Sequence, residues 1–343
     1  MKSLGKFPDR FVAEIAGQPE ALRRAGQGLI DQADQLARLR EAAAAASSLL
    51  FTGMGSSYDA CYPVVTALAG RGRACSMLDT AELLHFRMAS LRPDTLLVCV
   101  SQSGESAELV RLIDQLPHDR RPTVAAITNG AQNTLARAAD IALDTRAGEE
   151  HGPSTMTFVA SLTVLDALAG EPQVARAALE LDRLLADPAA SADHLCEWID
   201  GRPTLALVGR GSARAAAEMG ALTLKEAARF PAESLQAAQF RHGPLELAGP
   251  RLAVMVIATE PTTRELELGL AGELTAAGAA VLVVSQDGEG PDGSETITVG
   301  PLQGGLAAAA ATVPAQLLAW RLARSRGLTP GEFAIAGKVT TRE

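Results

Sequence analysis

Short runs of apolar residues recur along the chain, and each is followed by a turn and then by a helical pattern. In the first half these runs end near Gly53, Ser101, Thr128 and Leu143. Short apolar runs that are rich in β-branched residues and bounded by polar turns are typical of strands buried on both faces of a parallel sheet. Strands that alternate with helices predict an α/β fold with helices on both faces of the sheet.

The second half of the chain repeats this pattern. Residues 49–60 (LLFTGMGSSYDA) resemble residues 205–216 (LALVGRGSARAA), and each stretch predicts a strand, a glycine-rich turn and the start of a helix. In both halves the next strand ends 48 residues after the first, at Ser101 and at Ile257, and a third follows 27 or 28 residues later. Four strands matched at nearly constant offsets indicate two copies of one α/β unit.

Composition limits the class of protein. The 343 residues are 47% hydrophobic and 21% charged, as in globular proteins, and the net charge of -9 argues against a nucleic-acid partner. No apolar run suggests a membrane span and the N-terminus shows no signal peptide, so we expect a cytoplasmic protein without a membrane partner. The four cysteines and five histidines show no paired or metal-ligand spacing. We therefore expect free thiols and neither a metal nor a cofactor.

A hydroxyl-rich turn, Ser101-Gln102-Ser103-Gly104-Glu105-Ser106, joins the second predicted strand to the following helix. The first N–H groups of a helix are unpaired and its dipole is positive there, which suits a phosphate. Gly104 would let the backbone approach such a group closely. Serine and glutamate are also ordinary helix-capping residues, so the hexapeptide by itself fits either a phosphate site or a cap.

The equivalent turn of the second half has lost this character, because Glu260 and Pro261 stand among its residues. A carboxylate repels a phosphate and proline lacks an N–H donor. We therefore expect a phosphate site in the first half only, beyond the carboxyl ends of the strands, where Ser56 and Ser57 could also reach it. GMGSS lacks the third glycine of a dinucleotide fingerprint and no P-loop sequence occurs, so nucleotide binding is not expected.

Over nearly its whole length the chain resembles the sugar isomerase (SIS) domain family, in particular the isomerase half of glucosamine-6-phosphate synthases. The resemblance rests on five further motifs, at residues 11–19, 53–60, 147–158, 224–247 and 334–343, besides the serine turn. It implies an α/β fold with two tandem SIS domains, each a flavodoxin-like or Rossmann-like three-layer sandwich around a five-stranded parallel sheet. We expect an N-terminal helical segment (1–40), a phosphate-binding domain (41–195), a second domain (196–328) and a catalytic tail (329–343).

The resemblance also implies roles for particular residues. Glu226 matches the carboxylate that moves a proton between C1 and C2 of the sugar. His242 matches the histidine that opens the sugar ring from the other subunit, which implies a homodimer. Lys338 matches the lysine that contacts the open-chain sugar, as a Schiff base or as a charge partner. The sugar-phosphate cradle corresponds to Ser57, Ser101, Gln102, Ser103 and Ser106, and we add Ser56, Ser154 and Thr155 as further substrate-binding candidates.

These residue types suit the implied roles. A carboxylate can carry one proton between neighbouring carbons, a histidine can donate and accept near neutral pH, and a lysine amine can form an imine. Each residue also has a plain alternative. Glu226 could be a solvated helix residue, His242 a turn residue, and Lys338 part of a disordered tail.

Departures from the synthase pattern bear on the reaction. The chain shows no amidotransferase domain, so glutamine hydrolysis is not expected, and Thr223 and Met156 stand where the synthases carry lysines. We predict a phosphosugar isomerase or aminosugar-6-phosphate deaminase that acts on a hexose or hexosamine 6-phosphate by C1–C2 proton transfer. Two alternatives stay open, an ammonia-dependent ketose-6-phosphate aminotransferase and a non-catalytic sugar-phosphate sensor. The sequence does not identify the sugar.

Overall fold

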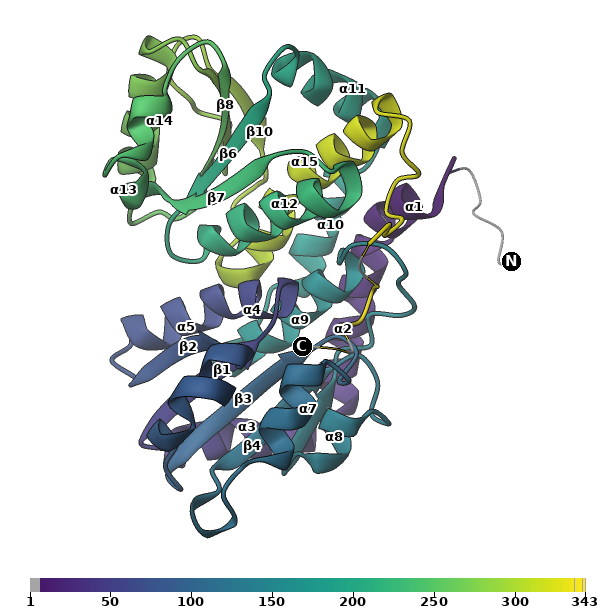
Figure 1. Ribbon diagram of the computed structural model, residues 1–343, viewed down its shortest axis with the longest axis vertical. Helices are drawn as coiled ribbons and strands as arrows, with labels where there is room; N and C mark the ends of the chain where they lie inside the picture. Colours follow the sequence, from purple (N-terminus) through teal and green to yellow (C-terminus); the bar gives the residue numbers. More distant parts are fainter. Residues whose placement is uncertain (1–6, 336, 341, 343) are drawn as a thin grey trace.

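Two five-stranded parallel sheets form the framework of the molecule, one in each domain (Figure 1). The computed structural model describes residues 7–335, 337–340 and 342. The first sheet has the order β2-β1-β3-β4-β5 and consists of β1 (Ser48–Gly53), β2 (Cys75–Asp79), β3 (Thr95–Ser101), β4 (Thr123–Thr128) and β5 (Ile141–Asp144). The second has the order β7-β6-β8-β9-β10 and consists of β6 (Thr204–Gly209), β7 (Ala232–Gln236), β8 (Leu252–Ala258), β9 (Ala280–Ser285) and β10 (Glu295–Thr298). The two orders correspond strand by strand, which confirms the duplicated α/β fold.

The pattern of apolar residues did not predict two of the strands, β2 and β7. Both lie at an edge of their sheet, and their residues are mostly half-buried. The neighbouring central strands β3 and β8 are buried along their whole length. An edge strand has no need of the continuous apolar run that identifies a central strand, so its pattern is weak.

Helices cover both faces of each sheet. In the first domain α3 (Ala33–Ala45), α5 (Cys61–Gly70) and α9 (Met156–Ala169) pack on one face, and α7 (Ala107–Asp114) and α8 (Thr134–Ala138) on the other. In the second domain α12 (Ala213–Ala228) and α15 (Gly304–Ser325) lie opposite α13 (Ala237–Phe240) and α14 (Arg264–Ala276). Successive side chains of a strand point to opposite faces of the sheet and therefore join different clusters of buried residues, as Val98 and Cys99 of β3 do. Shorter helical turns are α4 (Ser56–Asp59), α6 (Thr80–Glu82), Leu83–Arg87, Met88–Ser90, His118–Arg120 and Pro244–Leu247.

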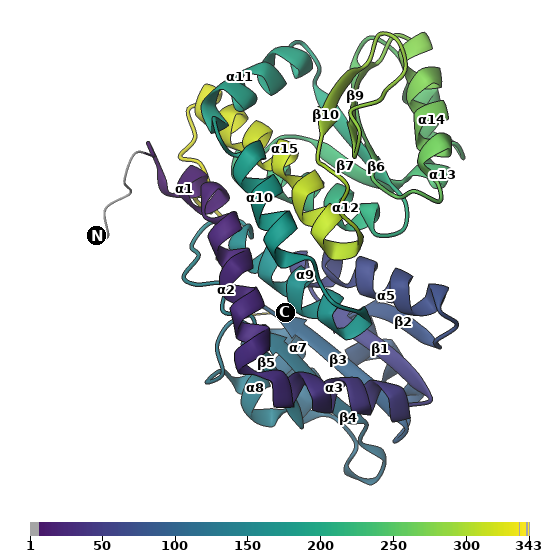
Figure 2. The ribbon, with the colours of Figure 1, turned by 180° about the vertical axis from the view of Figure 1, so that it is seen from behind.

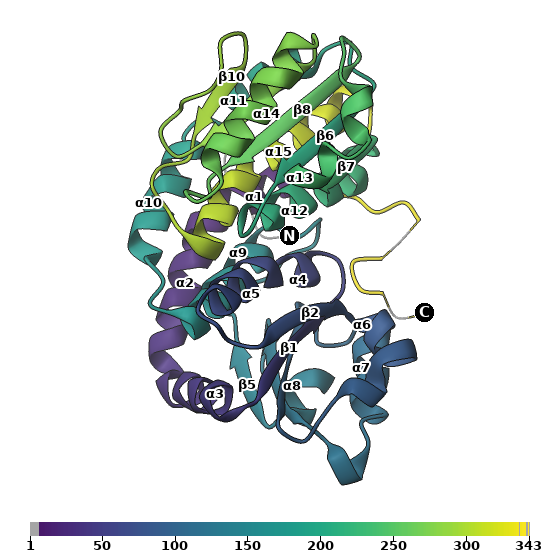
Figure 3. The same ribbon diagram turned by 90° about the vertical axis from the view of Figure 1, so that its left-hand side faces the viewer.

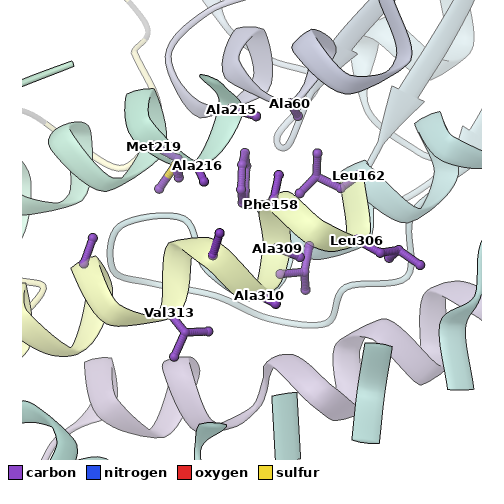
Figure 4. Packing of buried hydrophobic residues seen from close by; sticks show 14 of the residues in the cluster. Ala60, Phe158, Leu162, Ala215, Ala216, Met219, Leu306, Ala309, Ala310 and Val313 are labelled. Atoms are coloured by element: carbon purple, nitrogen blue, oxygen red, sulfur yellow. The ribbon is translucent and has the colours of Figure 1, made fainter. Parts of the chain in front are cut away.

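A helical layer between the sheets joins the two domains. It consists of α9, α12 and α15, and α1 (Arg10–Ala16), α2 (Gln18–Asp31), α10 (Val174–Leu184) and α11 (Pro188–Ile199) pack along one side of the molecule (Figure 2). One cluster of buried residues runs through this layer from the first domain into the second. Phe158 of α9 lies between Ala216 of α12 and Ala309 of α15 (Figure 4). The small alanine side chains let these helices approach closely, so the layer is densely packed.

Helix α15 is long and apolar enough, by length and composition, to cross a membrane, which corrects the expectation from the sequence pattern. Its apolar window is 89% buried inside the protein. Alanine contributes most of the apolar character, and residues such as Ala310 and Ala311 are fully buried. The helix therefore serves as a core helix that contacts both α9 and α12.

Gly220 offers a test of the contact between α12 and α15. A Cβ at this position would lie 2.7 Å from Leu207 Cδ2 and 2.9 Å from Ala315 Cβ. Gly220→Ala should therefore lower the free energy of unfolding by about 1–3 kcal/mol, as measured by denaturant unfolding. Gly269→Ala is the matched control, since nothing lies within 4 Å of a Cβ in α14, and it should stabilise the protein by up to about 1 kcal/mol. Equal effects of the two substitutions would contradict this packing.

Candidate active site

A cavity of about 470 Å³ lies between the first domain, helix α12 of the second domain and the C-terminal tail. Figure 3 shows the tail descending along the edge of the molecule from α15 towards α7. Nine of the eleven predicted site residues line the cavity, namely Ser56, Ser57, Ser101, Gln102, Ser103, Ser106, Ser154, Glu226 and Lys338. Thr155 and His242 do not. Residues separated by more than 200 positions thus meet at one place.

The serine turn is held in shape by its own hydrogen bonds. Gly104 N–H donates to Ser101 Oγ at 3.1 Å, and the hydroxyls of Ser101 and Ser106 are 3.4 Å apart. Gly104 has a φ of +65°, and a Cβ there would lie only 2.0 Å from Asn133 Oδ1, so the turn requires glycine. Ser106 is the N-cap residue of α7, but its side chain makes no capping hydrogen bond. Its hydroxyl therefore remains available at the cavity, beside the positive end of the helix.

Glu105 is the one acidic residue of this turn, and it points away from the cavity. Its carboxylate accepts the Thr134 N–H at 2.6 Å and the Thr134 hydroxyl at 2.7 Å, at the start of α8. These hydrogen bonds lower the pKa of Glu105. The carboxylate thus stabilises a neighbouring helix end, and the turn presents its serine hydroxyls to the cavity.

The corresponding region of the second domain is filled by carboxylates of the chain itself. Glu260 Oε1 accepts the N–H of Ser212, the residue that matches Ser56 in the repeat, at 3.1 Å. Nearby, Arg210 Nε lies 2.8 Å from the buried Glu267 Oε1. Both carboxylates are thus engaged with groups of the second domain itself, and a phosphate site in the first half only stays a prediction.

Glu226 lies in the last turn of α12, on the face that borders the cavity. Leu222, Lys225 and Arg229 line the cavity from the same helix end. Burial raises the pKa of Glu226 to about 7; the charges of Lys338 and Lys225 lower it, and that of Glu150 raises it. A carboxyl group with a pKa near 7 can accept and return a proton at neutral pH, which is what general acid–base catalysis requires.

Lys338 reaches the cavity wall and is fixed there. Its Nζ donates to Glu150 Oε2 and to the Gly152 carbonyl, both at 2.7 Å, and the side chain is 20% exposed. Two residues further on, the Thr340 carbonyl accepts the N–H of Ala107, the first residue of α7, at 3.1 Å. The described part of the tail is therefore bonded to the first domain on two sides of the cavity.

Thr155, which was predicted to contact the substrate, does not line the cavity. Its side chain is fully buried, and both its N–H and its hydroxyl donate to Glu150 Oε1, at 2.8 and 3.0 Å. The neighbouring Ser154 does line the cavity and accepts a hydrogen bond from Ser56 Oγ at 3.0 Å. Thr155 thus supports the cavity wall from behind.

The two positions that depart from the synthase pattern also lie away from the cavity. Thr223 is buried and its hydroxyl donates to the Met219 carbonyl within α12. Met156 is 8% exposed and belongs to the main hydrophobic cluster. Neither side chain borders the cavity in the part of the chain that the structure describes.

His242 follows α13 on the outer side of the second domain. Its residue is exposed, and it is absent from the cavity lining of the single chain. Its delivery to the site by a second subunit stays a prediction.

Several residues of the site were missed from the sequence. Lys225, Arg229 and Glu108 line the cavity, and Glu150 lies directly behind it. Lys225 and Arg229 follow from helical spacing once Glu226 is placed on the inner face of α12. Glu150 lies within the matched motif at 147–158, but nothing in that pattern pairs it with a lysine 188 residues away.

With fold and cavity established, comparison with known proteins identifies the class. The chain belongs to the SIS domain family, whose model matches residues 44–170 and 199–325. A curated relative from Pyrobaculum aerophilum, described as glutamine–fructose-6-phosphate aminotransferase (isomerizing), is 28% identical over 366 residues. That match covers 100% of this chain and 59% of the relative, so the chain spans less than two thirds of the relative's length.

Solved structures show the same fold. The C-terminal domain of glucosamine-fructose-6-phosphate aminotransferase from Francisella tularensis superposes with a TM-score of 0.83 at 23% identity, covering 96% of this chain and 99% of that one. Glucosamine-6-phosphate deaminase from Thermotoga maritima gives a TM-score of 0.67 at 22% identity, covering 91% and 98%. The same fold therefore occurs in a protein named as an aminotransferase and in one named as a deaminase.

Lys225 provides a test of the electrostatics around Glu226. The Lys225 charge lowers the pKa of Glu226, so Lys225→Gln should raise it further. If the ionised carboxylate is the base, the rising limb of the pH–rate profile should move to higher pH, by less than about one unit because Lys225 is exposed. Lys225→Arg keeps the charge and should leave the limb in place. Carbon-13 NMR of labelled glutamate gives the same pKa without turnover, and an unchanged value in Lys225→Gln would contradict the assignment.

Proposed function

We propose that the chain is a phosphosugar isomerase of the deaminating type, acting on a hexose or hexosamine 6-phosphate. The observation that carries the proposal is that Glu226, with a pKa of about 7, faces the same cavity as the serine turn. The serine turn belongs to the first domain and Glu226 to the second. A substrate held by its phosphate at one wall could thus present its reacting carbons to the other.

The serine turn supplies the phosphate handle. Ser101, Ser103 and Ser106 offer hydroxyls, and the N-terminus of α7 contributes the positive end of its dipole. The cavity-lining Lys225 and Arg229 add positive charge from α12. Glu108 and Glu226 add carboxylates to the same lining, so we assign the phosphate to the hydroxyls and cationic side chains and the hydroxyl-rich sugar to the rest of the cavity.

Glu226 supplies the proton transfer. As a carboxylate it takes the proton from C2 of the open-chain aldose and returns it to C1, while the proton of the C2 hydroxyl moves to the C1 oxygen, so that the aldehyde becomes a ketone. With a 2-amino sugar the same transfer gives a ketimine, and water then releases ammonia. The balance is aminohexose phosphate plus water to ketohexose phosphate plus ammonia.

Lys338 and His242 complete the proposed site. Lys338 places a cationic group at the cavity wall, where it can stabilise negative charge that develops on the sugar oxygen, or form an imine. His242 would open the sugar ring, and because it lies outside the cavity of one chain we propose that it comes from a second subunit of a homodimer.

The direction of nitrogen transfer is the finer part of the proposal. The aminotransferase relatives favour amination and the fold of the Thermotoga deaminase is compatible with removal. Purified protein should release ammonia from glucosamine 6-phosphate. Aminosugar formation from fructose 6-phosphate and ammonium, without release, would support the aminotransferase alternative, and aldose–ketose exchange without ammonia would support a plain isomerase.

Glu226→Gln separates an enzyme from a sensor. The variant keeps size and polarity but loses the base, so turnover should fall by about 10²–10⁴-fold while sugar-phosphate affinity, measured by calorimetry, changes little. Glu233→Gln, on the exposed part of β7, is the control and should retain activity. Tight binding of hexose phosphate by an unmodified protein that turns over none of these substrates would favour the sensor.

Removal of residues 329–343 tests the contribution of the tail. None of the described residues after Leu328 is buried, so the truncated protein should still fold, but at a lower unfolding temperature because the buried Glu150 loses its ion pair with Lys338. It lacks Lys338 and should lose its activity. Full activity of the truncated protein would show that Lys338 has no role.

A further inference from the structure

Glu150 is a fully buried carboxylate directly behind the cavity wall. Its side chain is 0% exposed and accepts five hydrogen bonds. Four come from its own loop and the start of α9, namely the N–H and hydroxyl of Thr155, at 2.8 and 3.0 Å, and those of Thr157, at 3.1 and 2.5 Å. The fifth comes from Lys338 Nζ at 2.7 Å. The first four donors fix the carboxylate without any help from the tail.

The charge of this group makes Lys338 its natural partner. A buried carboxylate is costly unless donors and a cation compensate it, and Lys338 is the cation that contacts it among the described residues. The tail is therefore attached, through Lys338, to a loop that is held in place by its own hydrogen bonds. The lysine is positioned by the loop rather than the loop by the lysine.

The second acceptor of Lys338 is fixed as well. Glu14 of α1, with a side chain only 6% exposed, accepts the N–H groups of His151 and Gly152 at 2.8 and 3.1 Å. These hydrogen bonds hold the loop that contains Gly152, whose carbonyl accepts the second hydrogen bond from Lys338 Nζ. An ammonium has three N–H groups, so one remains free for a ligand in the cavity.

We propose that Glu150 is a positioning residue that holds Lys338 Nζ at the cavity wall and orients its remaining N–H towards the sugar. The inference rests on the proposed function for its catalytic consequence. Because the Thr340 carbonyl is bonded to Ala107 at the phosphate-facing end of α7, the same attachment also keeps the tail across the cavity. Glu150 thus acts on the substrate only through Lys338.

The first test measures Lys338 itself and needs no turnover. Acetic anhydride should acetylate Lys338 at least about tenfold faster in Glu150→Gln than in the unmodified protein, as followed by peptide mass spectrometry; tenfold corresponds to about 1.4 kcal/mol. Glu267→Gln is the matched control. Glu267 is also a buried carboxylate beside a cation, Arg210, but lies outside the cavity lining, and its variant should leave Lys338 acetylation unchanged.

The second test measures catalysis. Glu150→Gln should lower kcat with little change in KM, and adding it to Lys338→Met should cause no further loss, because both changes remove one interaction. If Glu150→Gln does not fold, Glu150→Asp serves instead, since it keeps the charge but shortens the reach to Lys338. Unchanged acetylation in a folded Glu150 variant, or unchanged kcat with faster acetylation, would overturn the proposal. Absence of turnover in the unmodified protein would overturn the proposed function, while the acetylation rates would still decide whether Glu150 holds Lys338.

Discussion

Close packing of the central helical layer is the constraint on which the site depends. Helices α9 and α15 share one buried cluster with α12, and their small residues leave little freedom for one domain to shift against the other. Glu226 is attached to this layer through α12, whereas the serine turn is attached to the first sheet through β3. The distance between the serine turn, the proposed phosphate handle, and Glu226, the proposed base, is therefore set by hydrophobic packing away from the cavity.

Burial and the neighbouring charges together set the pKa of Glu226. Burial raises the pKa of Glu226, while Lys338 and Lys225 oppose the effect, and the balance lies near neutrality. Two further acidic groups are hydrogen-bonded outside the cavity, Glu105 to the start of α8 and Glu150 to the Thr155–Thr157 donors, whereas Glu108 lines it. In the second domain, Glu260 and Glu267 occupy the region that corresponds to the cavity side of the first domain. The two copies of one unit thus differ in the side chains that surround their corresponding turns.

Much of this could be predicted from the sequence, and the failures have physical causes. The repeat predicted four strands of each sheet, including the edge strands β5 and β10, but missed β2 and β7, whose mostly half-buried residues show little apolar pattern. The motifs brought Ser101 and Glu226 to one site, because each lies in a local sequence that is distinctive by itself. The pairing of Glu150 with Lys338 could not be predicted, since it depends on the path of the tail over the first domain. Thr155 was misplaced because a motif does not show which of two neighbouring side chains points inwards.

The most direct measurement is a crystal structure with a hexose or hexosamine 6-phosphate bound. The phosphate should lie on the Ser101–Ser106 turn, with C1 and C2 at the α12 wall and the Glu226 carboxylate within about 3–3.5 Å of both carbons. Lys338 should remain bonded to Glu150 and face the sugar. A phosphate bound away from the serine turn, or reacting carbons out of reach of Glu226, would contradict the proposed isomerase.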